Sequence, residues 1–306
     1  MKPFLHTYSI VARDEATGQL GVAVQSHWFN VGSMCPWVEA GVGAIATQSM
    51  VKVSYGPRGL ELLRAGKSAQ EALDFMLAED EEKESRQVAI VDALGRVAVH
   101  TGTRCIAQAG HIAGSSFSVQ ANMMKEASVW PAMADAFQKT QGDLAERMLA
   151  ALQAAQVQGG DIRGKQSAAM LVADGIRSDE PYEHMLLDLR VDDNPEPLAE
   201  LERLLHIQRA YEYMNKGDEL LTKGELDEAM KKYSMGASLA PAIDELPFWQ
   251  AATMAENGHL QEALPIFRSV FNKNRDWAEV LKRLPASGLF PDDKDMLDVI
   301  LRELKE

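Results

Sequence analysis

Side chains that can do chemistry stand at the ends of predicted β-strands in the N-terminal part of the chain. Thr7 opens the first predicted strand, Gln25 and Ser26 close the second, and Gln48 and Ser49 close the third. A hydroxyl group is a weak nucleophile at neutral pH unless a neighbouring group accepts its proton. These residue types therefore offer nucleophilic attack by a hydroxyl, provided that a base lies nearby. The alternative is that Thr7 is simply a β-forming residue at a strand start.

Two further segments carry charged side chains in predicted loops. Arg58 lies just after Tyr55 at the start of a predicted helix, and Asp161 and Arg163 follow a glycine turn. A guanidinium beside the N-terminal amides of a helix suits a carboxylate or another anion. The alternatives are that Arg58 is an ordinary surface residue, and that Asp161 and Arg163 form a salt bridge within their turn.

Metal and cofactor chemistry is not expected. His100, Cys105 and His111 share one short segment. Their spacing matches no zinc pattern, and no fourth ligand is evident. Gly41 and Gly43 lack the third spaced glycine of a dinucleotide-binding turn. We therefore predict no metal ion and no cofactor.

The predicted elements alternate between blocks of strands and pairs of helices. Strands are predicted over residues 7–12, 20–24, 41–47, 87–91, 96–100, 117–121, 166–172 and 186–191, and helices from about 57, 68, 129 and 143. Capping boxes mark two helix starts, Ser68 with Glu71 and Asp143 with Glu146. The acidic run 79–84 is interpreted as a solvated turn. Paired helices between blocks of antiparallel strands predict an α+β fold, a four-layer α-β-β-α sandwich with helices on the outer faces.

The composition is that of an ordinary globular protein with an acidic surface. The chain has 306 residues, of which 46% are hydrophobic and 25% charged, and its formal net charge is −14. Negative charge repels phosphate backbones and anionic lipids, so we expect neither nucleic acid nor a membrane as a partner. No apolar run is long enough for a membrane span or a signal peptide. The two cysteines, Cys35 and Cys105, fit free thiols in a cytoplasmic protein.

Five phrases of the sequence, in order, resemble those of one bacterial family, called domain of unknown function 1028. The phrases are residues 7–14 (TYSIVARD), 44–48 (AIATQ), 54–60 (SYGPRGL), 159–168 (GGDIRGKQSA) and 189–193 (LRVDD). That family is similar to the N-terminal nucleophile hydrolases, relatives of proteasome β-subunits. The resemblance covers residues 7 to about 200 and implies a hydrolase fold without naming a substrate.

The resemblance assigns the role of nucleophile to Thr7. In the superfamily the first residue of the mature chain attacks, and its own α-amine is the base. A peptide nitrogen is not basic, so this mechanism requires cleavage of the His6–Thr7 bond. Gln25, Ser26 and Gln48 match positions of catalytic partners, and the backbone of residues 47–49 matches an oxyanion hole. No residue clearly matches the lysine that proteasome-like members place near the nucleophile. The residues expected to bind substrate are Ser49, Tyr55, Arg58, Asn122, Asp161, Arg163, Gln166 and Ser167.

A repeated phrase marks the C-terminal part as helical. Gly-x-Leu-x-Glu-Ala begins at Gly224 and again at Gly258, which is the 34-residue period of a tetratricopeptide repeat. Prolines 195 and 197 interrupt the chain before it. We therefore predict a sandwich domain over residues 1–197 and an all-α, tetratricopeptide-like domain over 198–306. Two repeats are too few for a free-standing solenoid, so we expect the tail to pack on the first domain, on the helix from residue 198, or on another subunit of a homodimer or larger homo-oligomer.

Two hypotheses for the function follow. The leading one is a hydrolase that cleaves a small amide or peptide-like substrate through Thr7. The alternative is a non-catalytic binding protein on the same fold, whose helical tail binds a peptide, a cell-wall fragment or a partner subunit. Processing of the His6–Thr7 bond distinguishes the two hypotheses.

Overall fold

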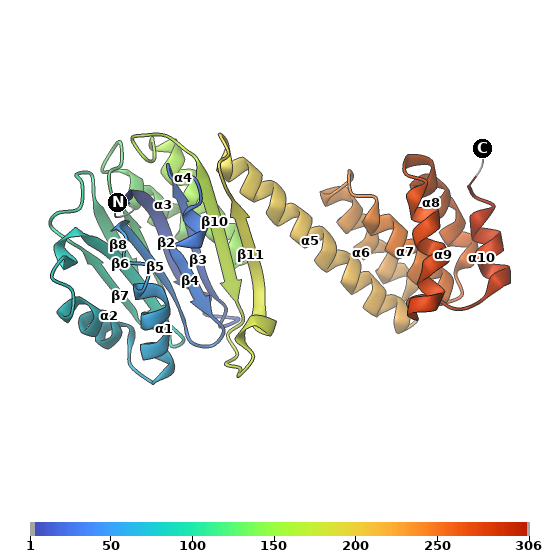
Figure 1. Ribbon diagram of the computed structural model, residues 1–306, viewed down its shortest axis with the longest axis horizontal. Coiled ribbons are helices and arrows are strands. Elements are labelled where there is room, and N and C mark those ends of the chain that lie inside the picture. Colours follow the sequence, from blue (N-terminus) through green and yellow to red (C-terminus); the bar gives the residue numbers. More distant parts are fainter. Residues whose placement is uncertain (1–3, 305–306) are drawn as a thin grey trace. The chain divides into compact units, whose positions relative to one another are not determined.

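The structure, a computed structural model, describes residues 4–304 and divides them into two compact units, one ending at Arg203 and one beginning at Leu204 (Figure 1). The strands of the first unit are β1 (Phe4–Leu5), β2 (Thr7–Arg13), β3 (Leu20–Ser26), β4 (Pro36–Glu39), β5 (Gly43–Met50), β6 (Arg86–Asp92), β7 (Val97–Thr101), β8 (Gly110–Gly114), β9 (Phe117–Ala121), β10 (Ser167–Ala173) and β11 (Met185–Val191). Its α-helices before residue 197 are α1 (Tyr55–Arg64), α2 (Ala69–Ala78), α3 (Val129–Lys139) and α4 (Leu144–Val157).

The strands form two antiparallel sheets. The first sheet has the order β1-β5-β6-β7, and β4 also pairs with β5. The second sheet has the order β11-β10-β3-β2-β9-β8. β2 is therefore an inner strand of the second sheet, and its first residue, Thr7, is paired with Ser26 of β3.

The two sheets face each other across a shared core. Val11, Val22 and Val24 of the second sheet pack with Ala44 and Ala89 of the first, and all five are fully buried. Burial of a valine-sized side chain contributes about 1.5–3 kcal/mol. Towards the N-terminal end of β2 the layer between the sheets becomes polar.

Helices cover the outer face of each sheet. α1 and α2 pack on the first sheet, where Leu60 and Leu73 contact a cluster that includes Ile45, Val88 and Ile90. α3 and α4 pack on the second sheet (Figure 1). Both predicted capping boxes are present, at the starts of α2 and α4. The predicted α+β fold with antiparallel sheets is confirmed.

The sequence prediction missed β1, β4 and β8. β4 begins with Pro36 and pairs only with β5 among the described strands, so the missing proline N–H costs no ladder hydrogen bond. β8 begins with Gly110 and ends with Gly114, and glycine weakens the sequence signal of a strand. Packing requires Gly110, because a Cβ atom there would lie 2.7 Å from the ring of Trp130.

The second unit is helical throughout its described residues. Its helices are α5 (Pro197–Thr222), which begins in the first unit, α6 (Leu226–Leu239), α7 (Glu245–Glu256), α8 (Leu260–Lys273), α9 (Asp276–Ser287) and α10 (Lys294–Leu301). Gly224 and Gly258 lie in helix-connecting turns with φ of 79° and 87°, a conformation that glycine adopts without strain. Tyr233 and Phe267 are both buried in the core of this unit. The predicted helical C-terminal region is confirmed.

The candidate metal ligands of the sequence do not gather. Within residues 4–304, no group of three His, Cys, Asp or Glu side chains is placed to hold a metal ion. His111 Nδ1 lies 2.8 Å from Thr101 Oγ1, and His100 Nε2 lies 2.9 Å from the Lys83 carbonyl oxygen. Over the same residues, no helix combines the length and the apolar character that a membrane crossing needs.

Candidate active site

Thr7 lies between the two sheets at the N-terminal end of β2. It is paired with Ser26, and the alternation of side chains along β2 places Thr7 and Ser9 on the same face. Thr7 has no exposed surface, and its Oγ1 has no hydrogen-bond partner among the described protein atoms. Buried hydroxyl groups are nearly always hydrogen-bonded, so an unpaired one calls for an explanation.

The carbonyl group immediately before Thr7 is bound by two donors. The His6 carbonyl oxygen accepts hydrogen bonds from Ser26 Oγ (2.7 Å) and Arg163 Nη2 (2.9 Å). The buried Asp161 fixes this guanidinium, accepting from Nε at 3.0 Å and from Nη2 at 2.7 Å. Two donors, one of them cationic, withdraw electrons from a carbonyl group and stabilise negative charge on its oxygen. The His6–Thr7 peptide bond is therefore polarised beside a hydroxyl without a partner.

Side-chain amides and hydroxyls continue from Thr7 between the sheets. We call Ser9, Gln48, Gln87, Gln120 and Asn122 the amide layer. Gln48 Nε2 donates to the Thr7 carbonyl oxygen (3.2 Å) and to Gln87 Oε1 (2.7 Å), and Asn122 Nδ2 donates to the same Gln87 oxygen (2.9 Å). Ser9 Oγ donates to Gln48 Oε1 (2.7 Å). All members are fully buried, so a rotation of any one of them leaves a polar group unpaired, and the network fixes their positions.

Strand pairing and a side-chain hydrogen bond hold β1 and His6 in place just before Thr7. β1 pairs with β5 in a register that sets Leu5 opposite Ser49. His6 is 4% exposed, and its Nδ1 lies 2.8 Å from Asn122 Oδ1. Because Asn122 Nδ2 donates to Gln87, Oδ1 acts as the acceptor, which assigns a proton to His6 Nδ1. Burial lowers the pKa of the His6 imidazole, outweighing the hydrogen bond to Asn122 that raises it, so the ring is neutral at pH 7.

The comparisons with known proteins agree on one family. Residues 7–201 match the family described as "Family of unknown function (DUF1028)". The chain belongs to this family. The crystal structure of protein SPO2555 from Silicibacter pomeroyi, also of DUF1028, is similar, with 32% sequence identity and a TM-score of 0.59 over 66% of this chain and 88% of that one. None of the curated proteins matches the chain. The predicted resemblance to DUF1028 is confirmed.

In the DUF1028 domain, Gln25 lies on the opposite face of the second sheet from Thr7. It is paired with Tyr8, whose hydroxyl donates to Gln156 Oε1 of α4 at 3.0 Å. Both polar atoms of the Gln25 side chain are buried without a hydrogen-bond partner among the described residues. The sheet therefore separates Gln25 from Thr7, whereas Ser26 bonds the carbonyl group before Thr7 directly.

Ser49 and Tyr55 lie beside a buried charge cluster. Tyr55 Oη donates to Asp80 Oδ2 (2.8 Å), and Arg86 Nε donates to the same oxygen (2.9 Å). Asp80 is only 8% exposed, so the interpretation of residues 79–84 as a solvated turn is wrong at this position: the guanidinium and the phenol compensate the burial of the carboxylate. Ser49 is paired in register with Arg86 and has a φ of 70°, which is uncommon for a residue with a side chain.

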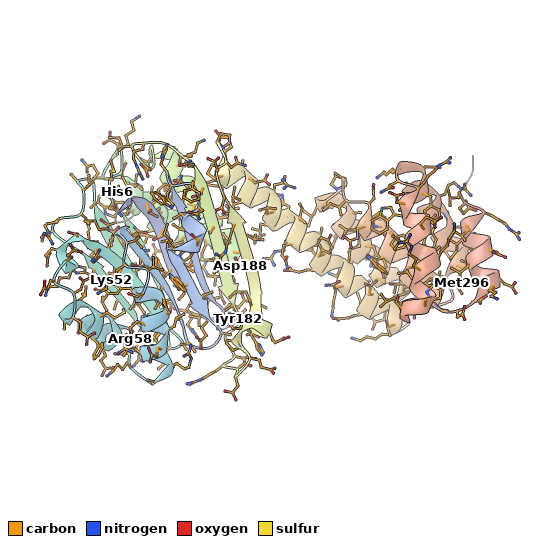
Figure 2. The ribbon with its side chains drawn as sticks, viewed as in Figure 1. His6, Lys52, Arg58, Tyr182, Asp188 and Met296 are labelled. Carbon is orange, nitrogen blue, oxygen red and sulfur yellow. The ribbon has the colours of Figure 1, made fainter. Side chains whose placement is uncertain are left out.

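Three other predicted substrate ligands have side chains that bond to groups other than Thr7 or its neighbouring carbonyl. Arg58 donates to Glu61 (2.8 Å) on the surface of α1, and Figure 2 shows it apart from the start of β2. Gln166 donates to a side chain in the loop after β11 (2.9 Å). Ser167 is paired with Ser26, one strand beyond it from Thr7, and its hydroxyl accepts a backbone N–H from the turn after β3 (3.0 Å). The structure therefore brings Asn122, Asp161 and Arg163 close to the candidate nucleophile and Ser167 into its cross-strand row, but among the described residues neither Arg58 nor Gln166 has a hydrogen bond to that row through its side chain.

Sequence reasoning missed the members of the site that lie inside strands. Ser9, Gln87 and Gln120 belong to β2, β6 and β9, strands in which almost every residue is buried. A signal was available for Ser9 and Gln87, because alternation assigns them to the face that carries Val11 and Ala89, two positions away. A polar side chain at such a position must find a partner inside the protein.

Proposed function

We propose that the DUF1028 domain is an amide-bond hydrolase of the N-terminal nucleophile type, with Thr7 as its nucleophile. One observation carries the proposal: the Thr7 hydroxyl has no partner, and the carbonyl of the preceding residue, His6, is bound by a cation and a hydroxyl. The packing order supports it. The layers follow one another in the order α1 with α2, first sheet, second sheet, α3 with α4. This order is consistent with the four-layer α-β-β-α sandwich of N-terminal nucleophile hydrolases.

The first step is cleavage of the chain before Thr7. Thr7 Oγ1 attacks the carbonyl carbon of His6, and Arg163 and Ser26 stabilise the negative charge on the oxygen of the tetrahedral intermediate. The C–N bond then breaks, the hydroxyl proton passes to the amine, and His6 becomes an ester on the Thr7 oxygen. Water hydrolyses this ester, releasing residues 1–6 with a terminal carboxylate and leaving a free amine on Thr7.

The free amine makes the second reaction feasible. It accepts the proton of the hydroxyl on the same residue, which a peptide nitrogen cannot do. Loss of residues 1–6 also empties the space that His6 fills, beside Arg163 and Ser26. The carbonyl group of a small amide or peptide-like substrate then takes the place of the His6 carbonyl as acceptor of the two hydrogen bonds.

The complete burial of Thr7 favours one alternative, a non-catalytic binding protein on the same fold. In that case β1 stays paired with β5, and the helical unit carries the function by binding a peptide, a cell-wall fragment or a partner subunit. The equivalent turns at Gly224 and Gly258 and the buried Tyr233 and Phe267 support a tetratricopeptide-like arrangement of this unit.

The test of the enzyme proposal uses a chain that begins at Thr7, made by removing a protein tag fused directly before this residue. We expect this chain to hydrolyse one or more members of a panel of acyl amides and ureido compounds. A Thr7→Ala chain should be inactive. A chain with one extra glycine before Thr7 should be inactive for as long as its intact mass shows that the glycine is still attached. The glycine-extended chain is the matched control, because it differs only in placing the amine within a peptide bond. Equal activity of a control that still carries its glycine, or inactivity of all three chains, contradicts the proposal.

Intact-mass measurement tests the cleavage step separately. The full-length chain, incubated at pH 7, should lose residues 1–6 over time, and Thr7→Ala should stay intact. Thr7→Ser keeps a hydroxyl at the same position and should still be cleaved. A full-length mass that persists in the unmodified chain excludes self-cleavage. The activity of the chain that begins at Thr7 then shows whether the protein is a hydrolase that another protease must activate.

A further inference from the structure

A large cleft opens at one edge of the first unit, away from Thr7. It has a volume of about 760 Å³ and lies between β4, α1, β11 and the short 3₁₀ helix η3 (Pro181–His184). We call it the edge cleft. Figure 2 shows its residues Tyr182 and Asp188 on the β11 side of the unit and His6 on the opposite side. The edge cleft is therefore distinct from the candidate active site.

The topology of the two sheets creates the edge cleft. β11 is the edge strand of the second sheet, and the first sheet ends at β4 on this side. Asp188 of β11 is paired with Leu171, which belongs to the core between the sheets, so the Asp188 side chain lies on the same inner face. The opposing sheet does not cover this part of the face. Met185, which pairs with Ala173 beyond a register shift in β11, also lines the edge cleft. A volume of this size is in the range of pockets that hold small ligands.

One part of the edge cleft is apolar and held in place. Trp37 donates its indole N–H to the Met34 carbonyl oxygen (3.1 Å), which fixes the orientation of the ring. Gly56 of α1 packs so close to this ring that a Cβ atom would lie 2.2 Å from it. Tyr182, on the far wall, is 89% exposed. Two aromatic rings and the neighbouring Met185 offer an apolar body of a ligand a surface to pack on.

The other part of the edge cleft carries two pairs of opposite charge. Arg64 donates through Nε (2.7 Å) and Nη2 to the two carboxylate oxygens of Glu39, and Arg190 donates in the same way to Asp188, at 2.7 and 3.1 Å. Each guanidinium has five N–H donors and uses two of these, and each carboxylate oxygen has a second lone pair. Each pair can therefore accept one anionic and one cationic group of a ligand at the same time. Glu61 also lines the cleft, and its carboxylate is bound by Arg58.

We propose that the edge cleft binds a short zwitterionic peptide with aromatic or branched apolar side chains. The two terminal charges of such a peptide match the two ion pairs: its carboxylate bonds to a guanidinium, and its ammonium bonds to a carboxylate. Its side chains pack on Trp37 and Tyr182. A purely anionic or purely cationic ligand would face a like charge in each pair, and a ligand without charge would leave the pairs unused. The inference does not depend on catalysis by Thr7.

The experiment measures binding of the dipeptide L-leucyl-L-phenylalanine to the full chain by calorimetry. We expect saturable binding at one site. The variants Arg190→Gln and Asp188→Asn should each weaken it about tenfold or more, which is the typical value of a hydrogen bond to a charged group. Arg203→Gln is the matched control, because Arg203 makes the same two-bond pair with Glu200 (2.6 and 2.8 Å) on α5, outside the edge cleft. Its affinity should equal that of the unmodified chain.

A second ligand distinguishes recognition of the terminal charges from non-specific apolar binding. The same dipeptide with its amine acetylated and its carboxylate amidated keeps the apolar side chains but has no charge, and it should bind about tenfold more weakly or worse. Any of three results overturns the proposal: equal affinity for both dipeptides, an equal loss of affinity in Arg190→Gln and Arg203→Gln, or no saturable binding. Unchanged thermal unfolding midpoints show that the variants fold; Arg190 and Asp188 are each 42% exposed in their side chains, so their exchange leaves the core intact.

Discussion

Replacing Gln87 by methionine tests whether the amide layer holds the two sheets together. The Gln87 side chain is fully buried, and its Oε1 is the closest acceptor for Gln48 Nε2 (2.7 Å) and for Asn122 Nδ2 (2.9 Å). Methionine has a similar length and no branch, so it fills the same space without these bonds. In the variant, the closest remaining acceptor for both amides is the Thr7 carbonyl oxygen, at 3.2 and 3.5 Å.

The variant also withdraws the Gln87 Nε2 donor from Thr101 Oγ1 (2.8 Å) and from the carbonyl oxygens of Ala121 (2.9 Å) and Gly110 (3.2 Å). An under-satisfied carbonyl oxygen costs less than an unpaired N–H, so the two amide donors set the expected magnitude. A buried polar group that loses its partner costs about 1–3 kcal/mol, so two such groups cost about 2–6 kcal/mol. The remaining long contacts and the apolar methionine offset part of this loss, which leaves a destabilisation of about 2–4 kcal/mol. Gln70→Met provides the control: Gln70 is exposed on α2 and donates to Asp74 (2.8 Å), and surface exchanges of this kind change stability by about 0.5 kcal/mol or less.

Native-state hydrogen exchange read by mass spectrometry measures this effect region by region. The free energy of opening should fall for peptides that cover β2, β6 and β9 and stay constant for peptides of the helical unit, which serves as an internal reference. Overall unfolding is less suitable, because a chain with two units need not unfold in a single step. A decrease below about 1 kcal/mol in β6, or one no larger than in Gln70→Met, would refute the reasoning that unpaired buried amides dominate here.

Three further predictions concern other parts of the molecule. Arg163→Gln removes a cationic donor to the His6 carbonyl and should slow loss of residues 1–6 about 100- to 1,000-fold in a mass-spectrometric time course; an unchanged rate contradicts its role. Burial lowers the pKa of His6, so the stability that this residue contributes is complete above its unfolded pKa of 6.5 and is lost as the pH falls through the lower folded pKa. Proteolysis of residues 1–6 should therefore become faster below pH 6.5. A rate that does not change with pH contradicts this prediction. Gly217→Ala places a Cβ atom 2.4 Å from the ring of Tyr233 and should lower the stability of the helical unit by about 1–3 kcal/mol in the same exchange experiment, with no change in β2.

Local patterns in the sequence predicted the regular elements well. Residues 7–12 were predicted as a strand and form most of β2, and the polar caps at Ser68 and Asp143 mark the starts of α2 and α4. These signals depend on residues that are close along the chain. β4 and β8 were missed because proline or glycine begins them, and their strand conformation depends on a neighbouring strand or on the Trp130 ring instead.

The candidate site was harder to predict because its contacts join distant segments. The family resemblance identified Thr7 and Arg163, but their connection through the His6 carbonyl spans 157 residues and depends on the order of strands in the second sheet. The charge of Asp80 suggested solvent, and its burial depends on the proximity of Arg86 and Tyr55, which lie 6 and 25 residues away in the sequence. The side of the sheet on which Gln25 lies follows from its register with β2, which the sequence of β3 alone does not determine.

The amide layer has one more consequence. Its members carry no ionisable group, so neither acidity nor salt alters the strength of the bonds among them, in contrast to the many ion pairs on the surface of the chain. Two histidines at its ends change their charge near neutrality. His6 is bonded to Asn122 next to Thr7, and His111 Nδ1 lies 2.8 Å from Thr101 Oγ1, the hydroxyl that accepts from Gln87 Nε2 (2.8 Å). Acidification therefore acts on this interior from two ends, at the residue before the candidate nucleophile and beyond Thr101 on the first sheet.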